Sequence, residues 1–197
     1  MSFKNFKSSA IESRILAAGS HIVTIVRIIL TNSFESWDRD LQKFVDKSDS
    51  YIWDSPTGQL FVEFEDPDGK RISARVNDSG YAKEDDYAPE SLEEEGLTVK
   101  EGFVCRELDN GKFQRILSDE RTEKAYAIVN KLLNAAGMPE GSDIETFMST
   151  AVAEKLTLGI RVAERIHKEK KYHDVKAYFK PEDIIKAAAP AQGTMEL

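Results

Sequence analysis

The chain has almost none of the residues that build disulfides or zinc sites. Its 197 residues include one cysteine, Cys105, and three histidines, which excludes an internal disulfide and leaves no ligand set at zinc spacing. The longest apolar stretch, 22–30, is too short for a membrane span and contains Thr24 and Arg27. The first ten residues lack the apolar core of a secretory signal. We therefore expect a cytoplasmic protein without membrane contacts, metal or other cofactor.

Sequence motifs of common catalytic sites are also missing. The chain contains no GxxxxGK[ST], GxSxG, HExxH or CxxC. Asp66 and Asp68 stand beside Gly69, a pattern typical of a turn rather than of a cation site. We expect no enzymatic activity, and a small magnesium-dependent nuclease is the weaker alternative.

Acidic residues outnumber basic ones, which gives a net charge of −8 and argues against nonspecific coating of duplex DNA. Much of this acidity lies in one segment, 84–95, where seven of twelve residues are acidic. We interpret the segment as a solvated loop, the alternative being a mimic of DNA that shields an empty groove.

Alternating apolar residues predict strands in the first part of the chain. Residues 21–30 are apolar on both faces, which is typical of a central strand. Residues 59–66 and 70–77 flank a DPDG turn and predict a hairpin. A second hairpin is expected over 102–117, and 31–50 is expected to be a long polar loop.

Helical spacing then replaces alternation. Ser118 is the expected cap of a helix over 121–136, and Ser142 that of a second helix over 144–153. Alternation returns in 156–166 and 172–179, which are joined by a basic turn.

Five principal strands, three before the helices and two after, predict a mainly β, α+β fold. We expect an OB-type five-stranded antiparallel barrel over 16–186 with a helical insertion at about 118–153. An N-terminal arm, 1–15, and a flexible tail, 187–197, complete the predicted domain organisation.

The outward faces of the predicted strands combine positive charge with aromatic rings. Alternation places the apolar residues of these strands inside. It places eight cationic or aromatic residues outside, namely Arg71, Arg75, Arg161, Arg165, Lys176, Phe61, Tyr172 and Tyr178. Trp37, from the long loop, is a further candidate. Cations track the phosphates of a single strand and rings stack on its bases, so these nine residues are the predicted DNA contacts. The alternative is an ordinary solvated face.

Three segments resemble phage single-stranded-DNA-binding proteins: LAAGSHIVTIVRI, QLFVEFEDPDGKRISARV and LTLGIRVAERIHKEKKYHDVKAYFKPEDI. The resemblance implies an OB barrel that coats and protects single strands during replication or recombination. It also implies multimeric coverage of the strand, and we expect self-association and replication proteins as further partners. The end of the chain, AQGTMEL, departs from the family because it lacks the long acidic tail that recruits such proteins. The alternative function is a virion or scaffold protein that uses the barrel for assembly, and a preference for RNA stays open.

Overall fold

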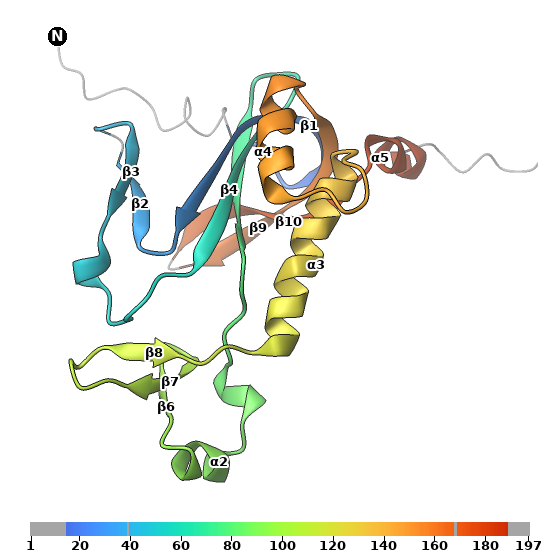
Figure 1. The fold of residues 1–197 in the computed structure, drawn as a ribbon. Coiled ribbons are helices and arrows are strands. Elements are labelled where there is room, and N and C mark those ends of the chain that lie inside the picture. Colours follow the sequence, from blue (N-terminus) through green and yellow to red (C-terminus); the bar gives the residue numbers. More distant parts are fainter. Residues whose placement is uncertain (1–14, 39, 168, 189–197) are drawn as a thin grey trace, which may run out of the picture. The chain divides into compact units, whose positions relative to one another are not determined.

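The main sheet is built around β1 (Gly19–Asn32) in the computed structural model (Figure 1). Its order is β10-β9-β1-β4-β5. β4 (Gly58–Glu65) and β5 (Arg71–Asn77) precede the helical insertion, and β9 (Thr157–His167) and β10 (Lys170–Phe179) follow it. The α+β class, the central position of the first strand and the division into three and two strands are confirmed.

The structure describes residues 15–38, 40–167 and 169–188. The predicted arm and tail therefore lie almost entirely outside the described residues, and their boundaries stay predictions. At the inner border of the arm, Leu16 is fully buried. At the other end, α5 (Pro181–Ala188) begins directly after the last strand, where proline is favoured in the first helical turn.

The predicted barrel is not confirmed, because the sheet formed by the described residues is open, with β10 and β5 as its edges. At the β5 edge, Arg71 forms a bridge with Ile15, and its carbonyl accepts a hydrogen bond from the Leu16 N–H at 3.5 Å. On the other edge strand, the register with β9 shifts at Lys176. Closure would require these edges to pair, and alternation within single strands does not encode which edges meet.

Two compact units divide the chain. The first comprises residues 1–28, 62–74 and 130–197, and the second comprises 29–61 and 75–129. Both units include parts of β1, β4, β5 and α3 (Asp119–Ala135), since the chain passes from one unit to the other within these elements.

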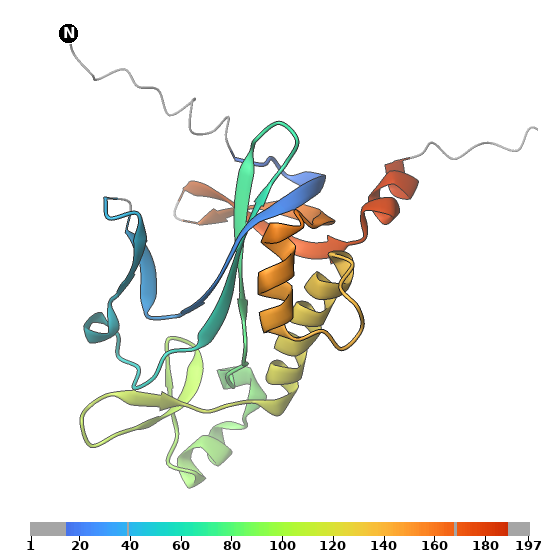
Figure 2. The same ribbon diagram turned by 45° about the horizontal axis from the view of Figure 1, so that its top comes forward.

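In the first unit, β1 and β9 pair antiparallel from Gly19 opposite Val162 to Thr24 opposite Thr157. α4 (Ile144–Ala153) lies beside the last turns of α3 (Figure 2). Its cap is Asp143, whose side chain accepts the Thr146 N–H at 2.6 Å, and not the predicted Ser142. The core of this unit contains Val23, Ile25, Val62, Phe64, Leu132, Phe147, Leu158 and Ile160.

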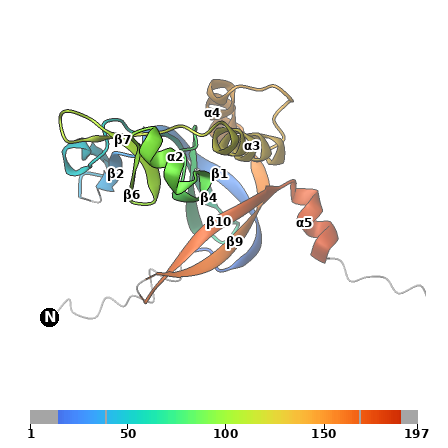
Figure 3. The same cartoon turned by 90° about the horizontal axis from the view of Figure 1, so that it is seen from below.

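The β9–β10 hairpin leads directly into α5 (Figure 3). The Ile184 side chain of this helix packs against Gly159 of β9, where an added Cβ would collide with it. The glycine thus serves helix packing.

In the second unit, the predicted loop over 31–50 is wrong, because it forms a hairpin of β2 (Glu35–Asp38) and β3 (Lys43–Asp46), followed by η1 (Ser48–Ser50). The Asp38 carboxylate accepts the backbone N–H groups of Asp40 and Leu41 at 2.9 and 3.0 Å, which closes the turn. Four-residue strands with polar positions are too short to show alternation.

The acidic segment lies at the surface as predicted, since all seven acidic residues of 84–95 are exposed, although Asp85 and Asp86 pair with Arg121. It is not a simple loop, however, and forms η2 (Glu84–Asp86) and α2 (Pro89–Glu94).

The predicted hairpin over 102–117 is confirmed as β7 (Phe103–Glu107) and β8 (Phe113–Arg115), and β6 (Thr98–Lys100) adds a third strand. In the core of the second unit, the buried residues Phe34, Trp53 and Cys105 pack with the partly buried Phe103 and Phe113.

The predicted helix over 121–136 is confirmed as α3, and Ser118 caps it by accepting the Arg121 N–H at 3.3 Å. The first turn of α3 docks on Gly80, whose carbonyl accepts the Ser118 N–H and whose N–H donates to the Thr122 hydroxyl, both at 3.0 Å. No helix among the described residues has both the length and the apolar character needed to cross a membrane.

We expect Gly80→Ala to lower the free energy of unfolding by about 1–3 kcal/mol, the usual cost of overpacking. The added Cβ would collide with the backbone of Arg121, so the first turn of α3 must move. Urea unfolding followed by circular dichroism measures the change. Ser79→Ala, in the same segment, is the control and should stay within about 0.5 kcal/mol of the wild type. Equal stability of the two variants would contradict the docking role of Gly80.

Candidate functional site

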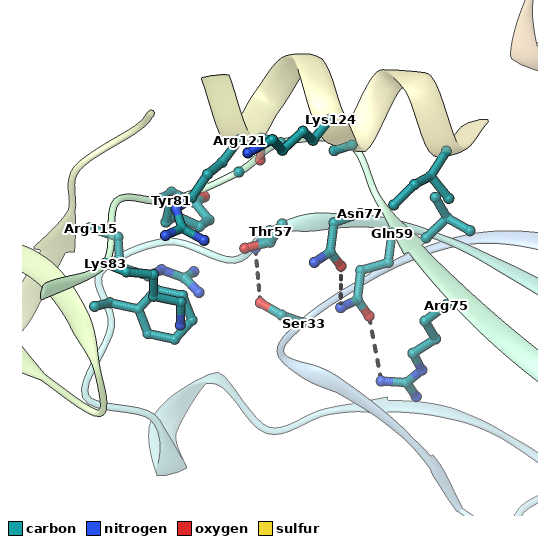
Figure 4. A pocket seen from close by; sticks show the side chains of 16 residues that line it. Ser33, Thr57, Gln59, Arg75, Asn77, Tyr81, Lys83, Arg115, Arg121 and Lys124 are labelled. Carbon is teal, nitrogen blue, oxygen red and sulfur yellow. Dashed lines mark hydrogen bonds between the residues drawn. The ribbon is translucent and has the colours of Figure 1, made fainter. Parts of the chain in front are cut away.

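The second unit contains a cleft of about 580 Å³, here called the basic cleft (Figure 4). Five of its lining residues are cationic: Arg75, Lys83, Arg115, Arg121 and Lys124. Tyr81 and Phe103 contribute rings, and Gln59 and Asn77 contribute amides. None of the described residues that line it is acidic. The cleft therefore concentrates positive charge in a protein whose net charge is −8.

Tyr81 and Lys83 come from one extended segment and both line the cleft. The Ala82 N–H donates to the Ile116 carbonyl at 2.9 Å, and the Ala82 carbonyl accepts the Val104 N–H at 3.0 Å. The segment is thus held extended between two neighbouring segments, with the Ala82 side chain 2 % exposed. Since side chains alternate along an extended chain, Tyr81 and Lys83 share the opposite side, where both line the cleft.

Lys83 lies over an aromatic ring. It forms an antiparallel bridge with Phe103, and its Nζ is 3.2 Å from the centroid of that ring. Burial lowers the pKa of Lys83, and repulsion from Arg121 lowers it further. An anion in the cleft would offset both effects.

Arg115 is held by two rings and a carbonyl. Its guanidinium carbon is 4.3 Å from the centroid of Tyr81 and 5.0 Å from that of Trp53. Its Nη2 donates to the Ser55 carbonyl at 2.7 Å. Burial lowers the pKa of Arg115, but a guanidinium titrates so far above neutrality that it stays charged.

Arg121 and Lys124 already have carboxylate partners. Arg121 donates two hydrogen bonds of 2.7 Å to Asp86 and lies 3.6 Å from Asp85, and Lys124 pairs with Glu120. The bonds from Arg121, with a backbone N–H, lower the pKa of Asp86 to about 2. These two cations add less free positive charge than the others.

Three aromatic rings form an aromatic cluster, defined as Trp37, Phe44 and Phe61. The Phe44 ring lies at its centre, 5.3 Å from Trp37 and 5.4 Å from Phe61, both edge to face. The Arg75 guanidinium lies 5.7 Å from the centroid of Phe44. All three rings are half-buried, so each retains accessible surface.

Arg75 joins the aromatic cluster to the basic cleft. Its Nη1 donates to Gln59 at 3.4 Å, and Gln59 donates to Asn77 at 3.0 Å (Figure 4). The structure thus brings together three of the nine predicted contacts in the second unit, namely Arg75, Phe61 and Trp37.

The other six predicted contacts belong to the first unit. On the exposed face of β9–β10, Arg165 lies 5.1 Å from the ring of Tyr172, which is directly opposite it. Arg161 lies 5.6 Å from the ring of Phe179. Asp174 pairs with Arg165 at 3.0 Å and with Lys176 at 3.1 Å, so part of this charge is neutralised within the hairpin.

The outward placement predicted for Tyr178 is wrong. The bulge at Lys176 shifts the register by one residue, so Tyr178 lies opposite the buried Ile160. Its ring is 6.3 Å from that of Phe64 in the core, and burial raises the pKa of Tyr178 to about 12. The same shift turns Phe179 toward Arg161.

Arg71 is ion-paired with two carboxylates of the neighbouring strand. Its Nε bonds Glu65, and its Nη1 lies 3.5 Å from Glu63. These interactions, with the Glu65 bond foremost, raise the pKa of Arg71. A phosphate would compete with these two carboxylates for the guanidinium.

Sequence reasoning missed most of the basic cleft: Tyr81, Lys83, Phe103, Arg115, Arg121 and Lys124. One signal was available, because Arg121, Lys124 and Ile128 recur at helical spacing on one face of α3. Tyr81 and Lys83 carry no such signal, since their segment becomes extended only by pairing with distant residues.

No group of three or more histidine, cysteine or acidic side chains in the described part of the chain could hold a metal ion. The Asp66 carboxylate accepts the N–H groups of Asp68 and Lys70 at 3.0 and 2.8 Å, which accounts for the predicted turn.

No protein-family model matches this chain, and no curated protein resembles it significantly in sequence.

We expect the Asp86–Arg121 pair to make stability depend on acid pH. The folded-state pKa of Asp86, about 2, lies below its ordinary value of 3.8. Its stabilising contribution is therefore complete above the ordinary value and is lost as the pH falls toward the folded value. Urea unfolding should show a difference between the wild type and Asp86→Asn that shrinks from about pH 6 to about pH 3. Asp109→Asn, in the exposed β7–β8 turn, is the control, and a pH-independent difference for Asp86→Asn would contradict the pair.

Proposed function

We propose that the protein binds single-stranded DNA without sequence preference and holds it extended, during phage replication or recombination. The observation that carries this proposal is the continuity of the aromatic cluster and the basic cleft through Arg75. A flexible polyanion with unpaired bases needs rings and cations side by side, and both are combined here on one unit.

The roles follow from the partners of each side chain. Phe61 and Trp37 are the proposed stacking rings, and Arg75 is the phosphate contact between them and the cleft. In the first unit, Arg161 and Tyr172 stay proposed contacts on the exposed face of the hairpin. Arg71, Arg165, Lys176 and Tyr178 are left out, because the three cations pair with carboxylates and Tyr178 packs on Phe64.

The strand order supports an OB-type assignment as part of this proposal. The sequence β9-β1-β4-β5 places a fourth strand beside the first, in the order 4-1-2-3 of a Greek key. OB folds are five-stranded, partly open Greek-key barrels that bind oligonucleotides. An open edge between β5 and β10 is compatible with that description.

Fluorescence anisotropy with labelled oligo-dT, mixed single strands and duplex DNA at several salt concentrations tests the proposal. We expect tighter binding to both single strands than to duplex, with a log–log salt slope of about −0.7 per phosphate contact. Intrinsic fluorescence should be quenched through Trp37, since Trp53 is only 4 % exposed. Absence of binding even at low salt would overturn the proposal, and stable assembly without DNA would favour the virion or scaffold alternative.

We expect Arg75→Gln to weaken oligo-dT binding about tenfold, the effect of losing one hydrogen bond to a charged group. The salt slope should become less steep by about 0.7, because one phosphate contact is lost. Arg106→Gln is the matched control, as Arg106 is an exposed strand arginine of the same unit outside the cleft lining. Equal losses in the two variants would mean that net charge, and not the position of Arg75, determines affinity.

A further inference from the structure

Two cations of the basic cleft, Lys83 and Arg115, differ from the rest in their partners. Their close partners are aromatic rings. Asp85 and Asp86 lie near enough to act on the charge of Lys83, and Asp54 and Glu101 on that of Arg115, but among the described residues neither cation forms an ion pair with a carboxylate. Arg121, in contrast, holds Asp86 through two hydrogen bonds of 2.7 Å. Lys83 and Arg115 therefore keep their charge available for a ligand.

Both side chains are fixed before any ligand arrives. The Lys83 Nζ lies 3.2 Å from the centroid of Phe103, and Arg115 lies 4.3 Å from that of Tyr81 and donates to Ser55 at 2.7 Å. The two rings contact each other edge to face at 6.4 Å, so they connect the two cations. Such fixed side chains lose little conformational entropy when a ligand binds.

The chemistry of these two groups favours a phosphate oxyanion. A guanidinium forms parallel hydrogen bonds to two phosphate oxygens, and an ammonium adds a compact point charge. A volume of about 580 Å³ lies within the range of small-molecule sites, roughly 300–1,000 Å³. A whole nucleotide therefore fits, and the Gln59 and Asn77 amides lie in the same cleft.

We propose that the basic cleft binds one phosphate group of a nucleotide between Lys83 and Arg115, and we call this phosphate-binding site the seat. The phosphate comes from a bound strand if the proposed function holds, but a free nucleotide or pyrophosphate presents the same oxyanion. The seat thus deepens the proposed function by assigning one anchored phosphate per chain, and it can be tested without DNA.

Isothermal titration calorimetry with pyrophosphate and with dTMP, on the full chain at low ionic strength, tests the seat. We expect one site per chain, and Lys83→Met should weaken binding about tenfold or more. Lys83→Arg keeps the charge and should retain most of the affinity. Lys100→Met is the matched control, because Lys100 also lies over a ring, 4.9 Å from Phe113, but does not line the cleft. Equal loss in the Lys100 and Lys83 variants would overturn the seat.

A measurement on the wild type removes any dependence on the folding of variants. Nuclear magnetic resonance of the Lys83 ammonium should show its pKa rising when pyrophosphate binds, since an anion stabilises the charged form. An unchanged Lys83 signal, or equal affinity for poly-glutamate, would overturn the seat.

The two proposals fail in different ways. Binding of oligo-dT without any Lys83-dependent binding of pyrophosphate overturns the seat and leaves the proposed function standing. Binding of pyrophosphate that depends on Lys83, in a chain that does not bind oligo-dT, supports the seat and overturns the proposed function.

Discussion

The basic cleft depends on two backbone hydrogen bonds made by Ala82. They hold residues 81–83 extended, so the buried methyl group of Ala82 faces the core and its two neighbours face the cleft. Gly80, which directly precedes this extended segment, docks the first turn of α3 and so positions Arg121. A four-residue segment without a recognisable motif thereby positions a ring, an ammonium and a helix that brings two further cations. The backbone, rather than contact between the like-charged side chains, brings these charges together.

Alternation along strands explains how the cleft continues into the aromatic cluster. Gln59 and Phe61 lie two residues apart on β4, as do Arg75 and Asn77 on β5, and the hydrogen bond from Gln59 to Asn77 links the two pairs. Leu60 and Val76, the intervening residues, are buried. One sheet face therefore carries one ring, two amides and a guanidinium, and this alternation could be predicted from the sequence. The β2–β3 hairpin supplies the remaining rings, and its existence was not readable.

The sequence is informative where a periodic pattern ends in strong turn or cap chemistry. The DPDG turn, the Ser118 cap and the apolar spacing of α3 each predict an element that the structure contains. Irregularities of a single residue, such as a β-bulge, cannot be predicted from these patterns. The bulge at Lys176 reverses the faces of all later residues in β10, which moves Tyr178 inward and Phe179 outward. Barrel closure and the position of Lys83 cannot be predicted from them either, because both depend on pairing between distant segments.

The cationic side chains of this protein have two kinds of neighbour, carboxylates and aromatic rings. The neighbour determines how easily a polyanion can bind each cation. Arg71 and Arg165 lie beside carboxylates, so a phosphate must first break an ion pair whose geometry is already satisfied. Arg75, Lys83 and Arg115 lie over rings, which provide contact surface without cancelling charge. A ring also repels an incoming anion less strongly than a carboxylate does. An acidic protein can thus keep a local positive field, because Asp85 and Asp86 of the acidic segment pair with Arg121, while the cleft cations with ring partners form no ion pair among the described residues.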